Sequence, residues 1–158
     1  MKRKLICVVL IMFIVVSLVA YTVYPMLRIV SGVSMSPTLR DGQYVLVQEC
    51  EDYSIGDIVV FKNLQTGGNW IKRVIGVSGD TVKIIKGTNE IYVNGKLIRE
   101  DYLNELTTYE NDIFIKVPKG HLFVMGDNRN HSIDSREIGC INICNVDGKV
   151  ILFKWKKK

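Results

Sequence analysis

Two serines near residue 35 are candidates for a catalytic nucleophile. They lie in Ser31-Gly-Val-Ser-Met-Ser-Pro-Thr-Leu39, which has neither a strand pattern nor a simple turn pattern. Ser36 precedes Pro37, an order typical of a helix N-cap whose hydroxyl is occupied by backbone N–H groups. Ser34 has no such local partner, and its own N–H could donate to an oxyanion. Ser34 is therefore the better candidate, although an ordinary loop accounts for the segment equally well.

A lysine could supply the base for such a serine. In Trp70-Ile-Lys-Arg-Val-Ile-Gly-Val-Ser-Gly-Asp80, strand alternation places Lys72 between Trp70 and Val74 on one face. Burial disfavours the charged amine, and lowering its pKa from about 10.4 to near 7 corresponds to about 4–5 kcal/mol. A neutral lysine can accept the proton of a serine hydroxyl. Lys83 also has apolar neighbours, and either lysine could simply extend its amine to solvent, so spacing leaves the choice open.

A third unusual stretch, Met125 to Gly139, concentrates opposed charges within ten residues. Charges this close favour a structural role, in which they hold the loop together. Ser132 is a candidate to hydrogen-bond the base, as the third member of other triads does. His131 would permit a serine–histidine pair, but a single histidine in a turn is usually solvated. The four charged residues are Asp127, Arg129, Asp134 and Arg136.

Metal chemistry has little support in the sequence, and we expect no metal or cofactor. Zinc would need more ligands than the two histidines and scattered cysteines offer. A Cys140–Cys144 or Cys50–Cys144 disulfide is chemically permitted outside the cell, but one of these three thiols would remain. Small buried hydrophobic residues are an equally good interpretation of these cysteines.

The elements that must position these residues begin with an apolar run. Leu5 to Leu27 is a stretch of 23 residues without a charge, and about 20 apolar residues cross a membrane core of about 30 Å. The apolar region of a cleaved secretory signal is shorter, about 7–15 residues. The basic residues before the run favour a cytoplasmic N-terminus. The sequence therefore predicts a cytoplasmic segment at 1–4, a retained single transmembrane helix at 5–24 and an extracytoplasmic domain at 25–158.

The external part has the alternation of β-strands, punctuated by glycine. Asn94-Gly95 predicts a type I′ hairpin turn within residues 90–98. Residues 99–112, rich in Glu, Asp, Asn and Thr, are expected to form a solvated excursion rather than part of a site. We predict one mainly β, antiparallel domain. The other predicted strands are 44–47, 57–61, 70–77, 81–85, 113–117, 122–125 and 150–153.

Composition and charge exclude several other classes of protein. The chain has 158 residues, of which 47% are hydrophobic and 23% charged, too apolar for disorder and too short for several domains. The net charge is +5, but seven positive charges lie in the two tails and the remaining residues carry −2. Because a basic face is absent, we expect no nucleic-acid partner. The tail from Phe153 to Lys158 could lie on anionic lipid or remain solvated.

Together these segments resemble the type I signal peptidases, membrane-anchored serine proteases that remove signal peptides from exported proteins. Ser34-Met-Ser-Pro-Thr-Leu39 resembles the family's nucleophile motif, and Gly56-Asp-Ile-Val-Val-Phe61 resembles its second motif. Ile71 to Asp80 resembles the lysine motif, and Gly126 to Arg136 the last. The motifs follow the family's order, and with the apolar run they cover nearly the whole chain.

The resemblance implies roles that spacing alone leaves open. It implies Ser34 as nucleophile and Lys72, not Lys83, as general base, with Ser132 where the family orients its lysine. Asp127, Arg129, Asp134 and Arg136 fall on supporting positions. It also implies a mainly β fold of the signal-peptidase type, acting on the signal peptides of exported preproteins at the lipid bilayer; we expect a monomer.

The resemblance also implies how substrate binds. The family binds an extended peptide as an added strand and accepts small side chains at the −1 and −3 positions, and Leu39 and Ile71 fall where it lines these pockets. Gly32 stands where some members have a serine that helps the oxyanion, so backbone donors are expected here, as in Gram-positive members. Self-cleaving repressor-type peptidases use the same chemistry but carry a DNA-binding domain. An inactive anchored module that captures extended peptides is a further alternative.

Overall fold

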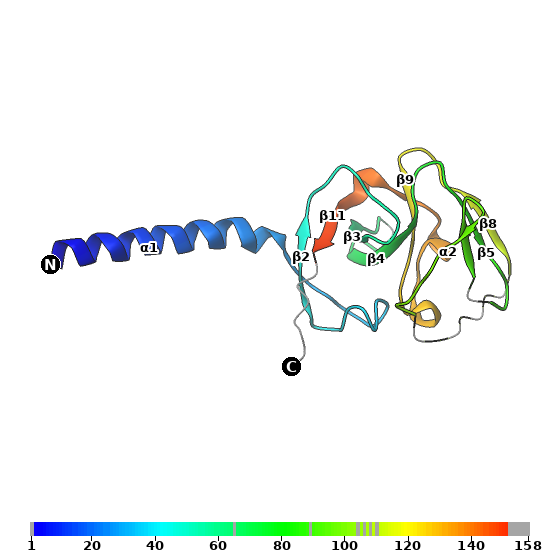
Figure 1. Cartoon of the computed structure of the whole chain (residues 1–158), viewed down its shortest axis with the longest axis horizontal. Helices are drawn as coiled ribbons and strands as arrows, with labels where there is room; N and C mark the ends of the chain where they lie inside the picture. The colour runs from blue at the N-terminus through cyan, green and yellow to red at the C-terminus, as the bar shows by residue number, and fades with distance from the viewer. Residues whose placement is uncertain are drawn as a thin grey trace.

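The apolar run at the N-terminus forms one helix, α1 (Lys2–Val23), which projects from the strands (Figure 1). The computed structural model of the chain describes residues 2–64, 66–88, 90–103, 105, 107, 109 and 111–151. A short 3-10 turn, η1 (Tyr24–Met26), with Pro25 near its start, follows the helix. The span Ile6–Met26 is long and apolar enough to cross a membrane, and none of it is buried. The helix therefore gains no stability from packing against the described part of the chain.

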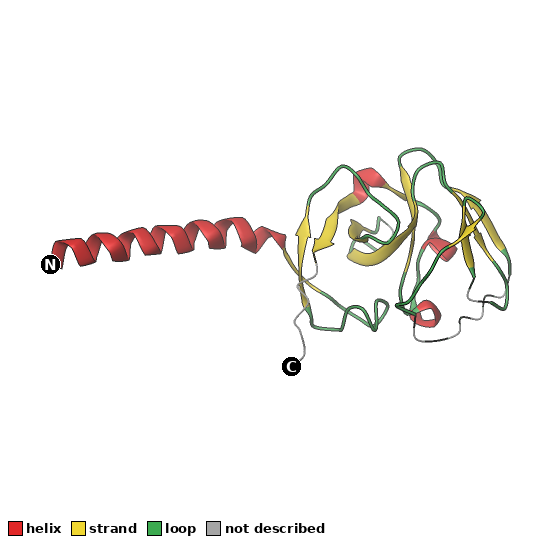
Figure 2. Ribbon diagram, in the orientation of Figure 1, coloured by secondary structure: helices red, strands yellow, loops and turns green. Residues whose placement is uncertain are grey.

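The prediction of a mainly β, antiparallel domain is confirmed (Figure 2). Within the described residues, one sheet has seven strands in the order β1-β2-β11-β3-β4-β9-β10, and a second has four in the order β7-β6-β5-β8. The second sheet lies at the end of the domain away from α1 (Figure 1). The strands are β1 (Leu27–Ile29), β2 (Tyr44–Gln48), β3 (Ile58–Lys62), β4 (Asn69–Gly76), β5 (Thr81–Ile84), β6 (Ile91–Val93), β7 (Lys96–Leu97), β8 (Ile113–Lys116), β9 (His121–Met125), β10 (Ile141–Asn142) and β11 (Val146–Ile151).

Three strand predictions differ from the structure. Strands β1 and β10 were not predicted, because they have only three and two residues, too few for alternation to show. Strand β11 begins at Val146, since Asp147-Gly148, which has the composition of a turn, forms a bulge within the strand. A side chain at Gly148 would meet the Gln48 carbonyl oxygen at 2.3 Å, so glycine is required there. Residues 152–153 of the predicted strand, and the basic tail to Lys158, lie outside the described residues.

The predicted hairpin forms between β6 and β7. Asn94 has φ 51° and Gly95 has φ 76°, the pair of positive angles that a type I′ turn requires. The side chain of Asn94 also donates to Asp80 and accepts from the Thr81 backbone N–H. The turn is thus anchored to β5.

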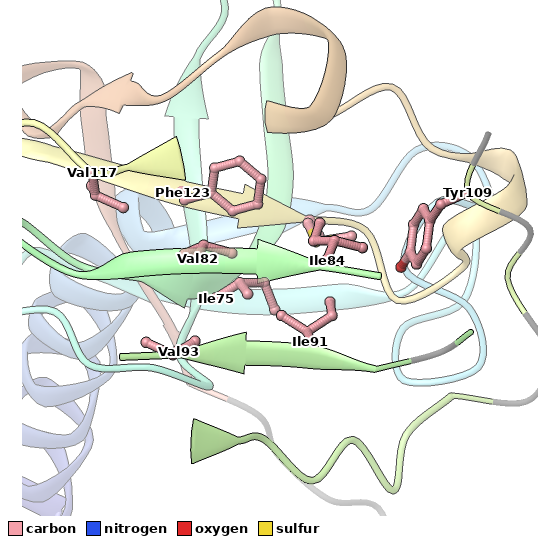
Figure 3. Close-up of a cluster of buried hydrophobic side chains, with 9 residues drawn as sticks. Ile75, Val82, Ile84, Ile91, Val93, Tyr109, Val117 and Phe123 are labelled. Carbon is pink, nitrogen blue, oxygen red and sulfur yellow. The ribbon is translucent and has the colours of Figure 1, made fainter. Parts of the chain in front are cut away.

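Strand β4 packs into each of the three hydrophobic clusters that the described residues form. Ile75 belongs to the cluster between the second sheet and β9 (Figure 3), Ile71 packs against the cluster under β1 and β2, and Val74 belongs to the third. A strand held by three separate clusters has little freedom to shift, because interiors are close-packed. The residues that β4 carries are therefore held in well-defined positions.

The cysteines form no disulfide. Cys7, Cys50, Cys140 and Cys144 are all free, so the bridge that the sequence permitted is absent. Cys140 packs against the cluster of Figure 3, and burial raises the pKa of its thiol. Cys144 is exposed. The interpretation as small buried residues therefore fits Cys140 and does not fit Cys144.

Candidate active site

Ser34 and Lys72 meet although 38 residues separate them. Lys72 Nζ donates to Ser34 Oγ over 2.8 Å, and a second bond of 3.1 Å reaches the Ile71 carbonyl oxygen. Lys72 is only 5% exposed. The Nζ–Oγ distance lies within the range over which a base takes a proton from a hydroxyl. The two groups are therefore placed for nucleophilic chemistry once the amine is neutral.

The surroundings of Lys72 favour the neutral amine. Burial lowers the pKa of Lys72 below its ordinary value of 10.5; the carboxylates of Asp134 and Asp127 oppose this, and Arg136 adds to it. The Trp70 ring, whose centroid lies 5.4 Å from Nζ, attracts the charged form and also opposes the shift. Desolvation is thus the main cause of the lowered pKa, as the position of Lys72 between apolar neighbours predicts.

We expect Lys72→Met to raise the unfolding temperature at pH 7. The pKa of Lys72 is lower in the folded protein than in the unfolded chain. At pH values between these two pKa values the unfolded chain binds more protons, so the stability of the wild-type protein rises with pH in this range. The free-energy cost of burying the protonated amine has its full value below the pKa that Lys72 has in the folded protein. It disappears above pH 10.5, where the amine is neutral in both states. Thermal unfolding of the detergent-solubilised protein from pH 7 to 10.5 should show a gain that shrinks with pH. A gain independent of pH, or one shared by the exposed Lys83→Met, would contradict this.

Lys83 and Ser36, the alternatives to Lys72 and Ser34, do not take part in the contact between amine and hydroxyl. Lys83 is exposed on β5 in the second sheet, opposite Tyr92 and Phe114. The predicted helix N-cap at Ser36 is wrong: residues 34–38 form turns, and the Ser36–Pro37 peptide bond is cis. The segment turns because Met35 and its neighbour in the turn, Leu39, are buried in one cluster. Ser36 lines a separate polar cavity of about 60 Å³.

The loop after β9 holds the backbone of Ser34. Asn128 N–H donates to the Ser34 carbonyl oxygen over 2.9 Å, and Asn128 Nδ2 donates to Val33 O over 3.2 Å. A Cβ at Gly126 would lie 2.6 Å from Ser34 O and 2.2 Å from Ser132 Oγ, so only glycine fits. No hydrogen bond among the described residues uses the Ser34 N–H, which leaves this donor available to a substrate. The Gly32 N–H, by contrast, donates to Asp41.

Asp134 organises the end of the same loop, as expected for these charges. Its fully buried carboxylate accepts from Gly126 N–H, from Ser132 Oγ at 2.8 Å and from Arg136 Nε at 2.7 Å. It also caps the short helix α2 (Ser135–Ile138). The Ser132 hydroxyl donates to Asp134, whereas Lys72 Nζ donates hydrogen bonds to Ser34 and Ile71. In this structure Ser132 is thus adjacent to the site without contacting the amine.

The other two charged residues, Asp127 and Arg129, form ion pairs with residues outside this loop. Arg73 Nε and Nη2 bind the two oxygens of Asp127 at 2.8 and 2.6 Å, and Arg129 pairs with Glu100. The expectation that residues 99–112 are a solvated excursion is wrong for Glu100, whose side chain is 4% exposed, and for the buried Thr107 and Tyr109. Residues 99, 101, 105, 111 and 112 are exposed as expected, and residues 104, 106, 108 and 110 lie outside the described residues. Tyr102 from the same segment lies under Arg73, 3.9 Å from ring centroid to Cζ. These partners could not be predicted from the sequence, because 54 and 29 residues separate the pairs and no local pattern links them.

Asp127→Asn is expected to destabilise the fold by about 3–5 kcal/mol, because it leaves the Arg73 guanidinium buried without its counter-charge. Denaturant unfolding measures the loss. The matched control is Asp57→Asn, whose partner Lys149 is 35% exposed; such a pair contributes about 1 kcal/mol or less. Equal losses in the two variants would contradict the assignment of Asp127 to a buried pair.

A cleft of about 360 Å³ runs past Ser34 and Lys72. Its walls are residues 29–35 and 69–72, with His131 and Ile133 from the loop after β9. Strand β4 pairs with β3 over residues 69–73, but β9 pairs with β4 only from Arg73 onward. Within the described part of the chain, no strand pairs with the second backbone edge of residues 69–72, which is therefore open. Ile71 lines the cleft, Leu39 is fully buried in the cluster that Ile71 contacts, and His131 is exposed.

Comparison with known proteins places these residues in a family context. The family model described as "Signal peptidase, peptidase S26" matches residues 2–155. The chain is 33% identical over 150 residues to signal peptidase I U of Bacillus subtilis, covering 85% of this chain and 79% of that protein. It is 35% identical over 147 residues to signal peptidase IB of Staphylococcus aureus, covering 80% and 75%. A crystal structure of a signal peptidase I from Enterococcus faecalis matches with TM-score 0.55 and 30% identity, covering 63% of this chain and 97% of that one.

Proposed function

Because the chain belongs to the signal peptidase family, peptidase S26, we propose that it removes signal peptides from exported preproteins with Ser34 as nucleophile and Lys72 as general base. The observation that carries this assignment is the 2.8 Å contact between a buried amine and a serine hydroxyl in an open cleft. Family membership makes the chain a peptidase; the roles of individual residues are the proposal.

In the proposed reaction, neutral Lys72 takes the Ser34 hydroxyl proton while Oγ attacks the carbonyl carbon of the scissile bond. The Ser34 N–H donates to the developing oxyanion. The carbonyl of the same peptide unit, Val33 O, accepts from Asn128 Nδ2 at 3.2 Å, which holds this donor in place. Lys72 then gives the proton to the leaving amine. Water, activated by the same amine, hydrolyses the acyl-enzyme and regenerates Ser34.

The substrate is proposed to bind as an extended strand along residues 69–72. The open edge of β4 beside the nucleophile supports this, because main-chain groups without strand partners can pair with an added peptide. Ile71 in the wall, backed by Leu39, leaves an apolar surface where the −1 and −3 side chains would lie. Small side chains at these positions would bring the scissile carbonyl closest to Ser34.

The helix α1 is proposed to anchor the enzyme in the membrane with its N-terminus in the cytoplasm. The unburied apolar span Ile6–Met26 supports the anchor, and the basic residues before it support the orientation. Ser34 lies only eight residues after Met26. The cleft would thus lie near the membrane surface, where a signal peptide held in the bilayer presents its cleavage site.

Cleavage of a preprotein with an Ala-x-Ala site by the full-length protein in detergent tests the proposal. We expect a new N-terminus directly after the second alanine, and loss of cleavage when Leu replaces Ala at −1 or −3. Cleavage at unrelated positions would contradict the specificity. Binding of the preprotein without cleavage would instead support an anchored peptide-capture module, which the open β4 edge alone could provide.

The pH dependence of the reaction follows from Lys72. Because only the neutral amine acts as base, kcat/KM should rise with pH from 6 to 9, and the controlling pKa should lie below 10.5, in the direction that burial dictates. Initial rates of preprotein cleavage measure this, with circular dichroism at each pH to verify that the protein is folded. A rate that falls steadily over the same range in folded protein would contradict a lysine base.

A further inference from the structure

Glu100 and Tyr102 form a clamp on the loop that holds the nucleophile. Both come from the segment after β7, and Tyr102 OH donates to Glu100 Oε1. Together they contact two arginines, Arg129 in the loop after β9 and Arg73 next to Lys72. Neither residue lines the cleft. We call this pair the Glu100–Tyr102 clamp.

The first arm of the clamp leads to Ser34 through Arg129. Glu100 Oε2 accepts from Arg129 Nη1 at 3.1 Å, and Oε1 accepts from Nη2. With its charge thus balanced, Arg129 donates from Nε to the Gly126 carbonyl oxygen at 2.9 Å. Gly126 is the residue that lies directly against Ser34 O. Three successive contacts thus connect Glu100 with the nucleophile, through Arg129 and Gly126.

Arg129 has a third contact, with a residue of the hydrophobic core. Tyr109, whose ring lies at one end of the cluster in Figure 3, contacts Arg129 Nη1 through its hydroxyl at 3.2 Å. Arg129 and Glu100 are 2% and 4% exposed at their side chains. Since water cannot replace a lost partner at such a site, removing the charge of Glu100 leaves a buried guanidinium unbalanced. We expect the loop to shift until the guanidinium reaches water or another acceptor.

The second arm acts on the strand that carries the base. The Tyr102 ring packs against the Arg73 guanidinium, which binds Asp127 through two hydrogen bonds. Asp127 and Arg129 flank Asn128, whose N–H binds Ser34 O. The clamp thus holds both neighbours of Asn128 and the neighbour of Lys72.

From this arrangement we propose that Glu100 and Tyr102 are positioning residues, which set the alignment of Ser34 Oγ with Lys72 Nζ without touching substrate. The proposal rests on the proposed function. Small displacements of a reacting group can cost about 100-fold in rate, so a loosened loop affects the chemical step. Substrate binding along β4 should be unaffected, because neither residue reaches the cleft.

Glu100→Gln tests the clamp, since it keeps the size of the side chain and removes its charge. We expect kcat for preprotein cleavage to fall by about 10- to 100-fold, with KM within about twofold of wild type. The matched control is Glu90→Gln: Tyr92 OH donates to Glu90 at 3.0 Å with the same two-residue spacing, but this pair is exposed on the second sheet. Its kcat should equal that of wild type.

All variants are assayed well below their unfolding temperatures, so that the folded fraction is the same. Unchanged kcat in Glu100→Gln, whatever its unfolding temperature, would overturn the positioning role, and so would a rise in KM alone. If Glu100→Gln does not fold, Tyr102→Phe decides, because it keeps the ring on Arg73 and loses only the hydroxyl; wild-type kcat there overturns the proposal. A wild-type protein that cuts no preprotein overturns the proposed function itself.

Discussion

Ser34→Ala should lower kcat for preprotein cleavage by at least about 10⁴-fold, and Lys72→Met should do the same. Without the hydroxyl there is no nucleophile 2.8 Å from the amine, and without the amine the hydroxyl keeps its proton. Because the two groups act as one unit, the double variant should be no slower than either single variant. Initial rates measured with the full-length protein in detergent give all three values.

Two matched variants control for this result. Ser36→Ala removes the neighbouring hydroxyl, which lines a different cavity, and Lys83→Met removes an exposed lysine on β5. Both should keep wild-type rates. If Ser34→Ala still cleaved the preprotein and Ser36→Ala did not, the nucleophile would have been assigned to the wrong serine. Multiplicative losses in the double variant would mean that Ser34 and Lys72 act separately.

Gly126→Ala should lower kcat by about 100-fold or more. The added methyl group would lie 2.6 Å from the Ser34 carbonyl oxygen and 2.2 Å from Ser132 Oγ, so the nucleophile or the loop must move. A displacement of that size misaligns Ser34 with Lys72. Preprotein cleavage gives the rate, and circular dichroism verifies that the variant is folded.

Gly68→Ala is the control for this variant. Its nearest neighbour, Thr66 Oγ1, would lie 4.0 Å from the new methyl group, so both rate and stability should stay close to wild type. Wild-type activity in folded Gly126→Ala would show that the contact between the loop and the Ser34 peptide is not needed for alignment.

The sequence predicted much of the fold, because its strongest signals are local. Alternation identified most long strands, and Asn94-Gly95 identified the hairpin, since a type I′ turn depends on those two residues alone. The unbroken apolar run identified α1. Spacing could not choose between Lys72 and Lys83, since both have apolar neighbours. The family resemblance favoured Lys72, and in the fold Lys72 lies beside Ser34 whereas Lys83 is exposed.

The support of the site could not be predicted, because it depends on pairs far apart in the chain. Glu100 lies in a segment whose composition is typical of a solvated loop, but its side chain is buried against Arg129, 29 residues further along the chain. Arg73 pairs with Asp127 across 54 residues. Likewise Ser36-Pro37 has the local pattern of a helix start, but burial of Met35 and Leu39 imposes a turn instead.

The most direct test is to trap the acyl-enzyme. Wild-type protein is mixed with excess preprotein, quenched in acid within the first turnover, digested and analysed by mass spectrometry. We predict that the peptide containing residue 34 gains the mass of the signal peptide as an ester on Ser34, and that Lys72→Met gives none. An adduct on Ser36, or cleavage of the preprotein with no adduct in a quench series that covers the first turnover, would contradict the assignment of Ser34 as the nucleophile.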